Sequence, residues 1–136
     1  MYGAAEFYFT AHKEGLKPVI GLEIPLFGTF TKSSKDMHSL VLLAKNYKGY
    51  QELSHIVSFA HKKNQVEGHP RATLDVIRDK SQNLIALTGG KDGILAQTFA
   101  CEGEGKALER LKILKTIFGE DPVSYTHLTL PTTSRV

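Results

Sequence analysis

The sequence predicts an α/β fold built from parallel strands with crossover helices. Three short aliphatic runs have the length and composition of strands covered on both faces: residues 19–24, 40–44 and 84–88. Stretches with apolar residues at three- and four-residue spacing, which is typical of amphipathic helices, alternate with these runs. Such alternation favours a parallel sheet, and three strands form only part of a sheet or barrel.

The first strand follows a clear helix stop. An opening helix is expected over residues 2–14, where Gly15 is placed to end it and Pro18 prevents it from resuming. The strand that follows contains a single carboxylate, Glu23. Because a charge in a buried strand is costly unless it is paired, hydrogen-bonded or bound to a metal, Glu23 is the first candidate functional residue.

Turn and capping residues divide the rest of the chain. Polar loops are expected over 26–37 and 61–71. Helices are expected over 46–60 with Asn46 as its cap, over 73–80 with Thr73 at its start, over 94–100, and over 106–118 with Gly119 at its end. Residues 123–136 are rich in threonine and have no useful periodicity, so we expect a non-native or disordered tail there.

The composition excludes several classes of protein. The chain has 136 residues, of which 41% are hydrophobic and 23% charged, with a formal net charge of +3. No apolar run approaches the roughly 18–20 residues that span a bilayer, and no signal-peptide pattern is visible. The single cysteine, Cys101, excludes an internal disulfide. We therefore expect a cytoplasmic domain with no membrane partner, whose scattered lysines form an ordinary solvated surface.

Two local patterns could carry chemistry. The 89–93 loop lies between a strand and a helix, where backbone amides can cradle phosphate, but it lacks the spacing of known phosphate-binding motifs, which favours a plain turn. No pair of histidines has a recognised zinc spacing. His38 stands directly before the second strand, although in a parallel sheet it would lie at the opposite strand end from Glu23.

A succession of motifs resembles a known family. The motifs are Met-Tyr-Gly-Ala-Ala-Glu-Phe-Tyr at 1–8, Gly-Leu-Lys-Pro-Val-Ile-Gly-Leu-Glu at 15–23, Leu-Val-Leu-Leu-Ala-Lys-Asn-Tyr-Lys-Gly-Tyr at 40–50, Leu-Ile-Ala-Leu-Thr-Gly at 84–89 and Ile-Phe-Gly-Glu-Asp at 117–121. Over residues 1–122 the chain closely resembles the N-terminal PHP (polymerase and histidinol phosphatase) domain of the alpha subunit of bacterial DNA polymerase III. The 89–93 loop looks most like the shorter alpha subunits of Gram-positive bacteria.

The resemblance implies a distorted β/α barrel with a metal cluster at the strand ends. It implies that Glu23 corresponds to a family metal ligand. Ser39 stands where the family has a ligand histidine, with His38 displaced by one residue to the other face of the strand, and Gly90 stands where it has a ligand cysteine. The family's other ligands would precede residue 1 or follow residue 136, so we expect a fragment of a PHP domain with a degenerate site.

Three functions are weighed. The leading hypothesis is a structural PHP region of a replicative polymerase, whose partners are the rest of the alpha subunit and, through it, DNA and the replisome. The magnesium-binding palm of the parent is absent, so the chain is expected to be inactive alone and to need no Zn or Mn. The alternatives are a metal-dependent phosphoesterase or 3′–5′ proofreading exonuclease that uses Glu23, His38 and His69, and a small α/β module that binds phosphate at the 89–93 loop.

Overall fold

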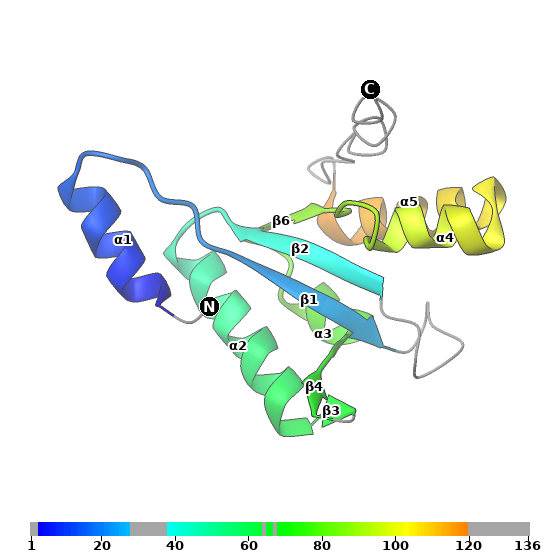
Figure 1. Ribbon diagram of the computed structural model, residues 1–136, viewed down its shortest axis with the longest axis horizontal. Helices are drawn as coiled ribbons and strands as arrows, with labels where there is room; N and C mark the ends of the chain where they lie inside the picture. The colour runs from blue at the N-terminus through cyan, green and yellow to red at the C-terminus, as the bar shows by residue number, and fades with distance from the viewer. Residues whose placement is uncertain (1–2, 28–37, 64, 67, 120–136) are drawn as a thin grey trace.

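A computed structural model of the chain describes residues 3–27, 38–63, 65–66 and 68–119 (Figure 1). The helices are α1 (Ala4–Lys13), α2 (Tyr47–Lys63), α3 (Leu74–Asp79), α4 (Ile94–Glu102) and α5 (Glu104–Phe118). The strands are β1 (Gly21–Phe27), β2 (His38–Ala44), β3 (Gln65–Val66), β4 (His69–Pro70), β5 (Ala72–Thr73) and β6 (Leu84–Leu87). The predicted tail over 123–136 lies outside the described residues, as does most of the predicted loop over 26–37.

The main sheet is mixed, so the prediction of parallel strands with crossover helices is wrong. Its strand order is β5-β1-β2-β6, and β2 runs antiparallel to both β1 and β6. Among the strands that the structure describes, only β1 and β5 pair in parallel. No helix was predicted between the first two strands, and the short connection over 28–37 is too brief for a parallel crossover, which needs about a dozen residues or more. The two-residue β5 gave no apolar signal in the sequence.

The strands are buried on one face only, which corrects the prediction that they are covered on both. In β1 the side chains of Ile24 and Leu26 are buried, whereas Glu23 and Phe27 are exposed. In β2 and β6 the alternate residues are likewise buried and half-buried. This alternation is typical of a sheet that packs against helices on one side.

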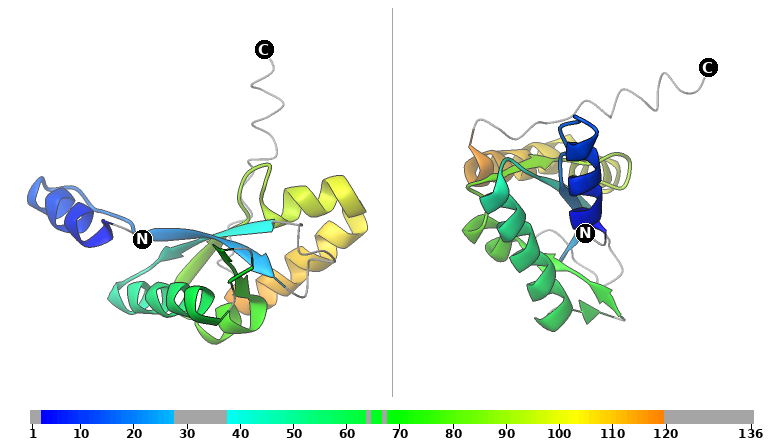
Figure 2. Two further views of the ribbon diagram at one scale, coloured as in Figure 1. Left: turned by 60° about the horizontal axis from the view of Figure 1, so that its bottom comes forward. Right: turned by 90° about the vertical axis from the view of Figure 1, so that its left-hand side faces the viewer.

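The core lies between the buried face of the sheet and the helices. Figure 2 shows α2 and α3 beneath the sheet, with α4 beyond one end of it and α5 running from that end back toward α3. Leu40 and Leu42 of β2 pack with Leu53 of α2, Ile77 of α3 and Leu114 of α5 in a single cluster. Each fully buried side chain of this size contributes about 1.5–3 kcal/mol of hydrophobic stabilisation relative to exposure.

Capping residues place the helix ends as predicted. The amide of Asn46 caps α2, because its Oδ1 accepts a hydrogen bond of 3.0 Å from the N–H of Gly49. Gly15 adopts a left-handed conformation (φ 74°) after α1, and Leu16 donates its N–H to the carbonyl of Ala11, which is the Schellman pattern. Gly119 likewise follows α5 with φ 71°. The predicted 61–71 loop instead contains the end of α2 and the small β3–β4 hairpin.

Helix α1 stands apart from the rest of the molecule. In Figures 1 and 2 it lies beyond the end of β1, joined to it by an extended segment. Ala11 is buried, but Phe7, Tyr8 and Phe9 are exposed. The apolar stripe predicted for this helix therefore does not enter the main core.

Candidate functional site

Glu23 and Ser39 meet on the face of the sheet that faces away from the core. We call this the open face, which carries the exposed or half-buried side chains of Glu23, Ser39, Val41, Leu43, Ile85 and Leu87. Val41 lies directly across from Glu23 on β2, and Ser39, two residues before Val41, is the diagonal neighbour of Glu23. The hydroxyl of Ser39 donates a hydrogen bond of 3.0 Å to Oε1 of Glu23. The carboxylate is thus exposed and hydrogen-bonded, and the desolvation cost expected from the sequence does not arise.

The glycine loop lies against the same point. The N–H of Ser39 donates to the carbonyl of Asp92 at 3.2 Å, and Ser39 forms an isolated parallel bridge with Gly93. The loop closes on itself, because Gly93 donates its N–H to the carbonyl of Gly90 at 2.9 Å. The structure therefore gathers Glu23, Ser39 and the 89–93 loop at one end of the open face.

The glycines of this loop are not equivalent. Gly89 has φ 79°, and a Cβ on Gly93 would lie 2.0 Å from the carbonyl oxygen of Thr88, so both positions require glycine. A Cβ on Gly90 would meet nothing within 4 Å, and its φ is not in the left-handed region. The backbone therefore leaves room for a side chain at Gly90.

His38 lies on the other face of the sheet. It pairs with Leu26 across the hairpin and is 7% exposed, on the same side of β2 as Leu40 and Leu42. The antiparallel pairing brings the C-terminal half of β1 beside the start of β2. His38 and Glu23 therefore do not lie at opposite ends of the sheet, as a parallel arrangement would require. The orientation of the side chain separates them, because neighbouring residues of a strand face opposite ways.

The second histidine candidate, His69, also lies apart from Glu23. His69 is exposed in β4, which belongs to the separate two-stranded sheet. Within the described residues, no group of three or more His, Cys, Asp or Glu side chains could hold a metal ion. One carboxylate beside a hydroxyl and a glycine does not fit the nitrogen, sulfur and carboxylate donor set that zinc or manganese takes in proteins.

A hollow in another part of the molecule was not predicted from the sequence. It has a volume of about 800 Å³ and lies between α1, the segment after it, and the start of α2. Tyrosine and phenylalanine side chains from both helices line it. Apolar spacing along the two helices predicts core positions for Tyr8 and Tyr50, and Phe9 and Tyr47 fall outside that pattern, so no local pattern predicts an exposed hollow here.

Comparison with known protein families identifies the class to which this chain belongs. The model of the PHP domain family matches residues 1–124, which is most of the chain. The chain belongs to the PHP domain family.

Within this family, the chain is similar to proteins that share one name and align with most of its length. It is 36% identical over 99 residues to "DNA polymerase III subunit alpha" of Buchnera aphidicola, covering 72% of this chain and 8% of that protein. It is 33% identical over 135 residues to the protein of the same name from Aquifex aeolicus, covering 89% of this chain and 11% of the relative. The Vibrio cholerae protein of that name is 30% identical over 141 residues, covering 94% of this chain and 12% of that protein.

The chain spans about a tenth of the length of these curated relatives. Its likeness to the shorter alpha subunits of Gram-positive bacteria is not tested by them and stays a prediction. Among the described helices, none is long and apolar enough to cross a membrane.

Proposed function

We propose that this PHP segment is a structural part of a cytoplasmic DNA polymerase III alpha subunit and that its ancestral metal site is degenerate. The observation that carries the proposal is the pairing of Glu23 with the hydroxyl of Ser39 at 3.0 Å, beside a glycine loop. The family resemblance puts a histidine at position 39 and a cysteine at position 90. In this chain Ser39 offers only a hydroxyl, which is a weak metal ligand, and Gly90 has no side chain.

The open face supports a role within a longer polypeptide. Val41, Leu43, Ile85 and Leu87 form a half-buried apolar surface next to Glu23. In a distorted barrel of the family type, further strands would extend the sheet and enclose this surface. They would also pair with the open edges of the sheet, which are otherwise prone to aggregation. The rest of the alpha subunit is then the main partner, with DNA and the replisome contacted through it.

Phosphoesterase or proofreading exonuclease activity is the rival function. It needs several ligands around one or more metal ions, and Glu23, His38 and His69 do not converge. A phosphate site at the 89–93 loop is the third candidate. It is disfavoured because the N–H of Gly93 is already engaged with Gly90 within the loop.

Restoring the missing ligands tests the proposal. We expect the double variant Ser39→His/Gly90→Cys to bind Zn²⁺ at least about tenfold more tightly than the natural chain in a competition titration. Adding Glu23→Ala should abolish the gain, because the carboxylate is the remaining ligand. Gly105→Cys combined with Ser39→His is the matched control, since a Cβ at Gly105 also meets nothing within 4 Å but lies on α5.

Two results would overturn the proposal. One is tight, Glu23-dependent Zn²⁺ or Mn²⁺ binding by the natural chain, together with phosphodiester hydrolysis. The other is incorporation of nucleotides by this chain in a primer-extension assay, because polymerisation is assigned here to a magnesium-binding palm elsewhere in the alpha subunit.

A further inference from the structure

A further hollow lies between α2 and α3. It has a volume of about 350 Å³. The residues that line it recur at steps of three and four along α2 from His55 to Lys63, and along α3 and its C-cap from Val76 to Lys80. Because residues at this spacing share one face of a helix, one face of each helix forms one wall of the hollow. We call this hollow the lysine groove.

The lysine groove has an excess of positive charge. Lys62 and Lys63 line it from the last turn of α2, and Lys80 lines it from the end of α3. Among the lining residues, Asp79 is the one carboxylate. In the part of the chain that the structure describes, none of the three lysines forms an ion pair with Asp79 or with another carboxylate. Lysines that are scattered in the sequence are therefore brought together with their charges unpaired.

Apolar side chains complete the lining of the lysine groove. Phe59 of α2 and Val76 of α3 line it and are half-buried, so each still exposes apolar surface. Apolar surface gains free energy when apolar side chains cover it, and ammonium groups attract carboxylates. The lining therefore complements a partner that carries both kinds of group.

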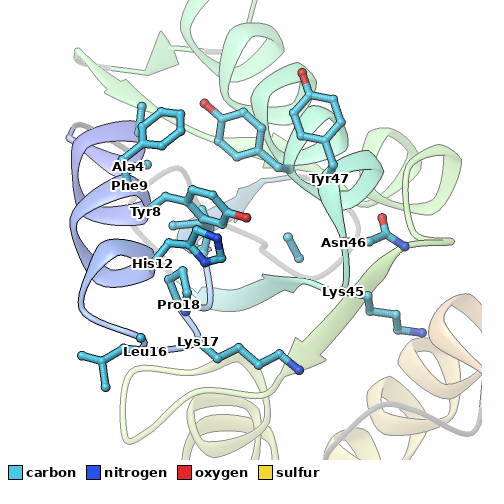
Figure 3. A pocket seen from close by; sticks show the side chains of 15 residues that line it. Ala4, Tyr8, Phe9, His12, Leu16, Lys17, Pro18, Lys45, Asn46 and Tyr47 are labelled. Carbon is cyan, nitrogen blue, oxygen red and sulfur yellow. The ribbon is translucent and has the colours of Figure 1, made fainter.

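The hollow between α1 and α2 differs in this respect. In Figure 3 the side chain of Lys45 extends away from the rings that line that hollow, and Lys45 has an interaction of its own. The charge around that hollow therefore does not define an occupant. The lysine groove is distinguished by three unpaired lysines within one lining.

We propose that the lysine groove binds an acidic polypeptide segment that has apolar side chains on one side. The carboxylates of the segment pair with Lys62, Lys63 and Lys80, and its apolar side chains pack on Phe59 and Val76. A nucleic acid strand would supply the negative charge but not the aliphatic side chains. The inference goes beyond the proposed function and does not depend on the ancestral metal site, so either can fail without the other.

Fluorescence anisotropy of the full chain with a labelled acidic peptide tests the proposal. The probe is a peptide of about twelve residues, made of glutamate and leucine, with the leucines on one side of the helix it can form. We expect the triple variant Lys62→Gln/Lys63→Gln/Lys80→Gln to raise the Kd by about 3- to 150-fold, because three exposed charge pairs are lost.

A second triple variant is the matched control. Lys13→Gln/Lys17→Gln/Lys91→Gln removes the same amount of charge from exposed lysines that do not line the lysine groove. It should change the Kd by less than about twofold at about 150 mM salt, where distant exposed charges are largely screened. None of the six lysines is buried, and circular dichroism spectra matching that of the natural chain verify that both variants are folded.

Two altered peptides separate the charge from the apolar contact. Replacing the leucines of the probe by serine should weaken binding at least about tenfold, because the contacts with Phe59 and Val76 are lost. Replacing the glutamates by lysine should abolish binding, because the charges then repel those of the groove.

The proposal fails on any of four results. They are no binding of the glutamate–leucine peptide at about 50 mM salt, an equal loss of affinity in the two triple variants, equal affinity for the serine-containing peptide, and a dimer that the groove variant dissociates while peptide binding is absent. The last result would show that a second copy of the chain covers the lysine groove.

Discussion

The two faces of the same hairpin have different roles. The core face of β1 and β2 carries Ile24, Leu26, Leu40 and Leu42, all nearly inaccessible to solvent. The open face carries Glu23 and Ser39 beside half-buried aliphatic residues. One face accounts for the stability of the fold, and the other holds the positions at which chemistry would occur. A shift of one residue exchanges these roles, as His38 and Ser39 illustrate.

The largest expected difference is between neighbouring apolar residues on the two faces. Leu42→Ala should lower the free energy of unfolding by about 2–5 kcal/mol, because Leu42 is completely buried and a cavity would remain. Val41→Ala should cost about 1 kcal/mol or less, because Val41 is only half-buried on the open face. Urea unfolding of both variants gives the comparison, and equal losses would contradict the assignment of the faces.

The glycine loop should show a smaller contrast. Gly93→Ala should destabilise the protein by about 1–3 kcal/mol, because its Cβ would collide with the carbonyl of Thr88. Gly90→Ala should change stability by less than about 0.5 kcal/mol, because the space around it is open. Thermal melts of the pair decide this, and a severe loss in Gly90→Ala would show that glycine at this position is required by the fold.

Adjacent polar residues on opposite faces provide a third test. His38→Ala should cost about 1–3 kcal/mol, since removing a buried side chain leaves a cavity on the core face of β2. Ser39→Ala should cost about 0.5 kcal/mol or less, because water can replace the hydroxyl beside Glu23. If chemical denaturation shows Ser39→Ala to be the more damaging change, the register of β2 is misassigned.

The smallest effect is expected at Glu23 itself. Glu23→Gln keeps an acceptor for the Ser39 hydroxyl and removes only an exposed charge, so stability should change by less than about 0.5 kcal/mol. Denaturation midpoints of Glu23→Gln and the natural chain at low and high salt measure this change in stability. A loss of several kcal/mol would mean that the carboxylate has a stabilising partner beyond Ser39.

Local signals in the sequence predicted most element boundaries. Asn46, Gly15 and Gly119 act through hydrogen bonds and backbone conformations confined to a few neighbouring residues, and their predicted roles are confirmed. Strand direction was mispredicted because the alternation of strands and helices fails between the first two strands, where the short connection over 28–37 favours an antiparallel pair. The two-residue β5 contains too few residues to produce a pattern, yet it is the parallel neighbour of β1 in the sheet.

The candidate site was predicted in its residues but not in its geometry. The resemblance identified Glu23, Ser39 and Gly90. The contact of Glu23 with Ser39 follows from the antiparallel register of β1 and β2, and the 89–93 loop is held beside them by the contacts of Ser39 with Asp92 and Gly93. The hollow between α1 and α2 was missed because Tyr8 and Tyr50 have the spacing of core residues on amphipathic helices. Exposure of such rings depends on where α1 lies, which no local pattern encodes.

The central claim is that Glu23 has lost its metal-binding partners. Zinc and manganese content per chain, measured after saturation and gel filtration for the natural protein and Glu23→Ala, tests it most directly. We expect no stoichiometric metal in either protein and no difference between them. Stoichiometric metal that is lost in Glu23→Ala would contradict it and establish an intact metal site on the open face.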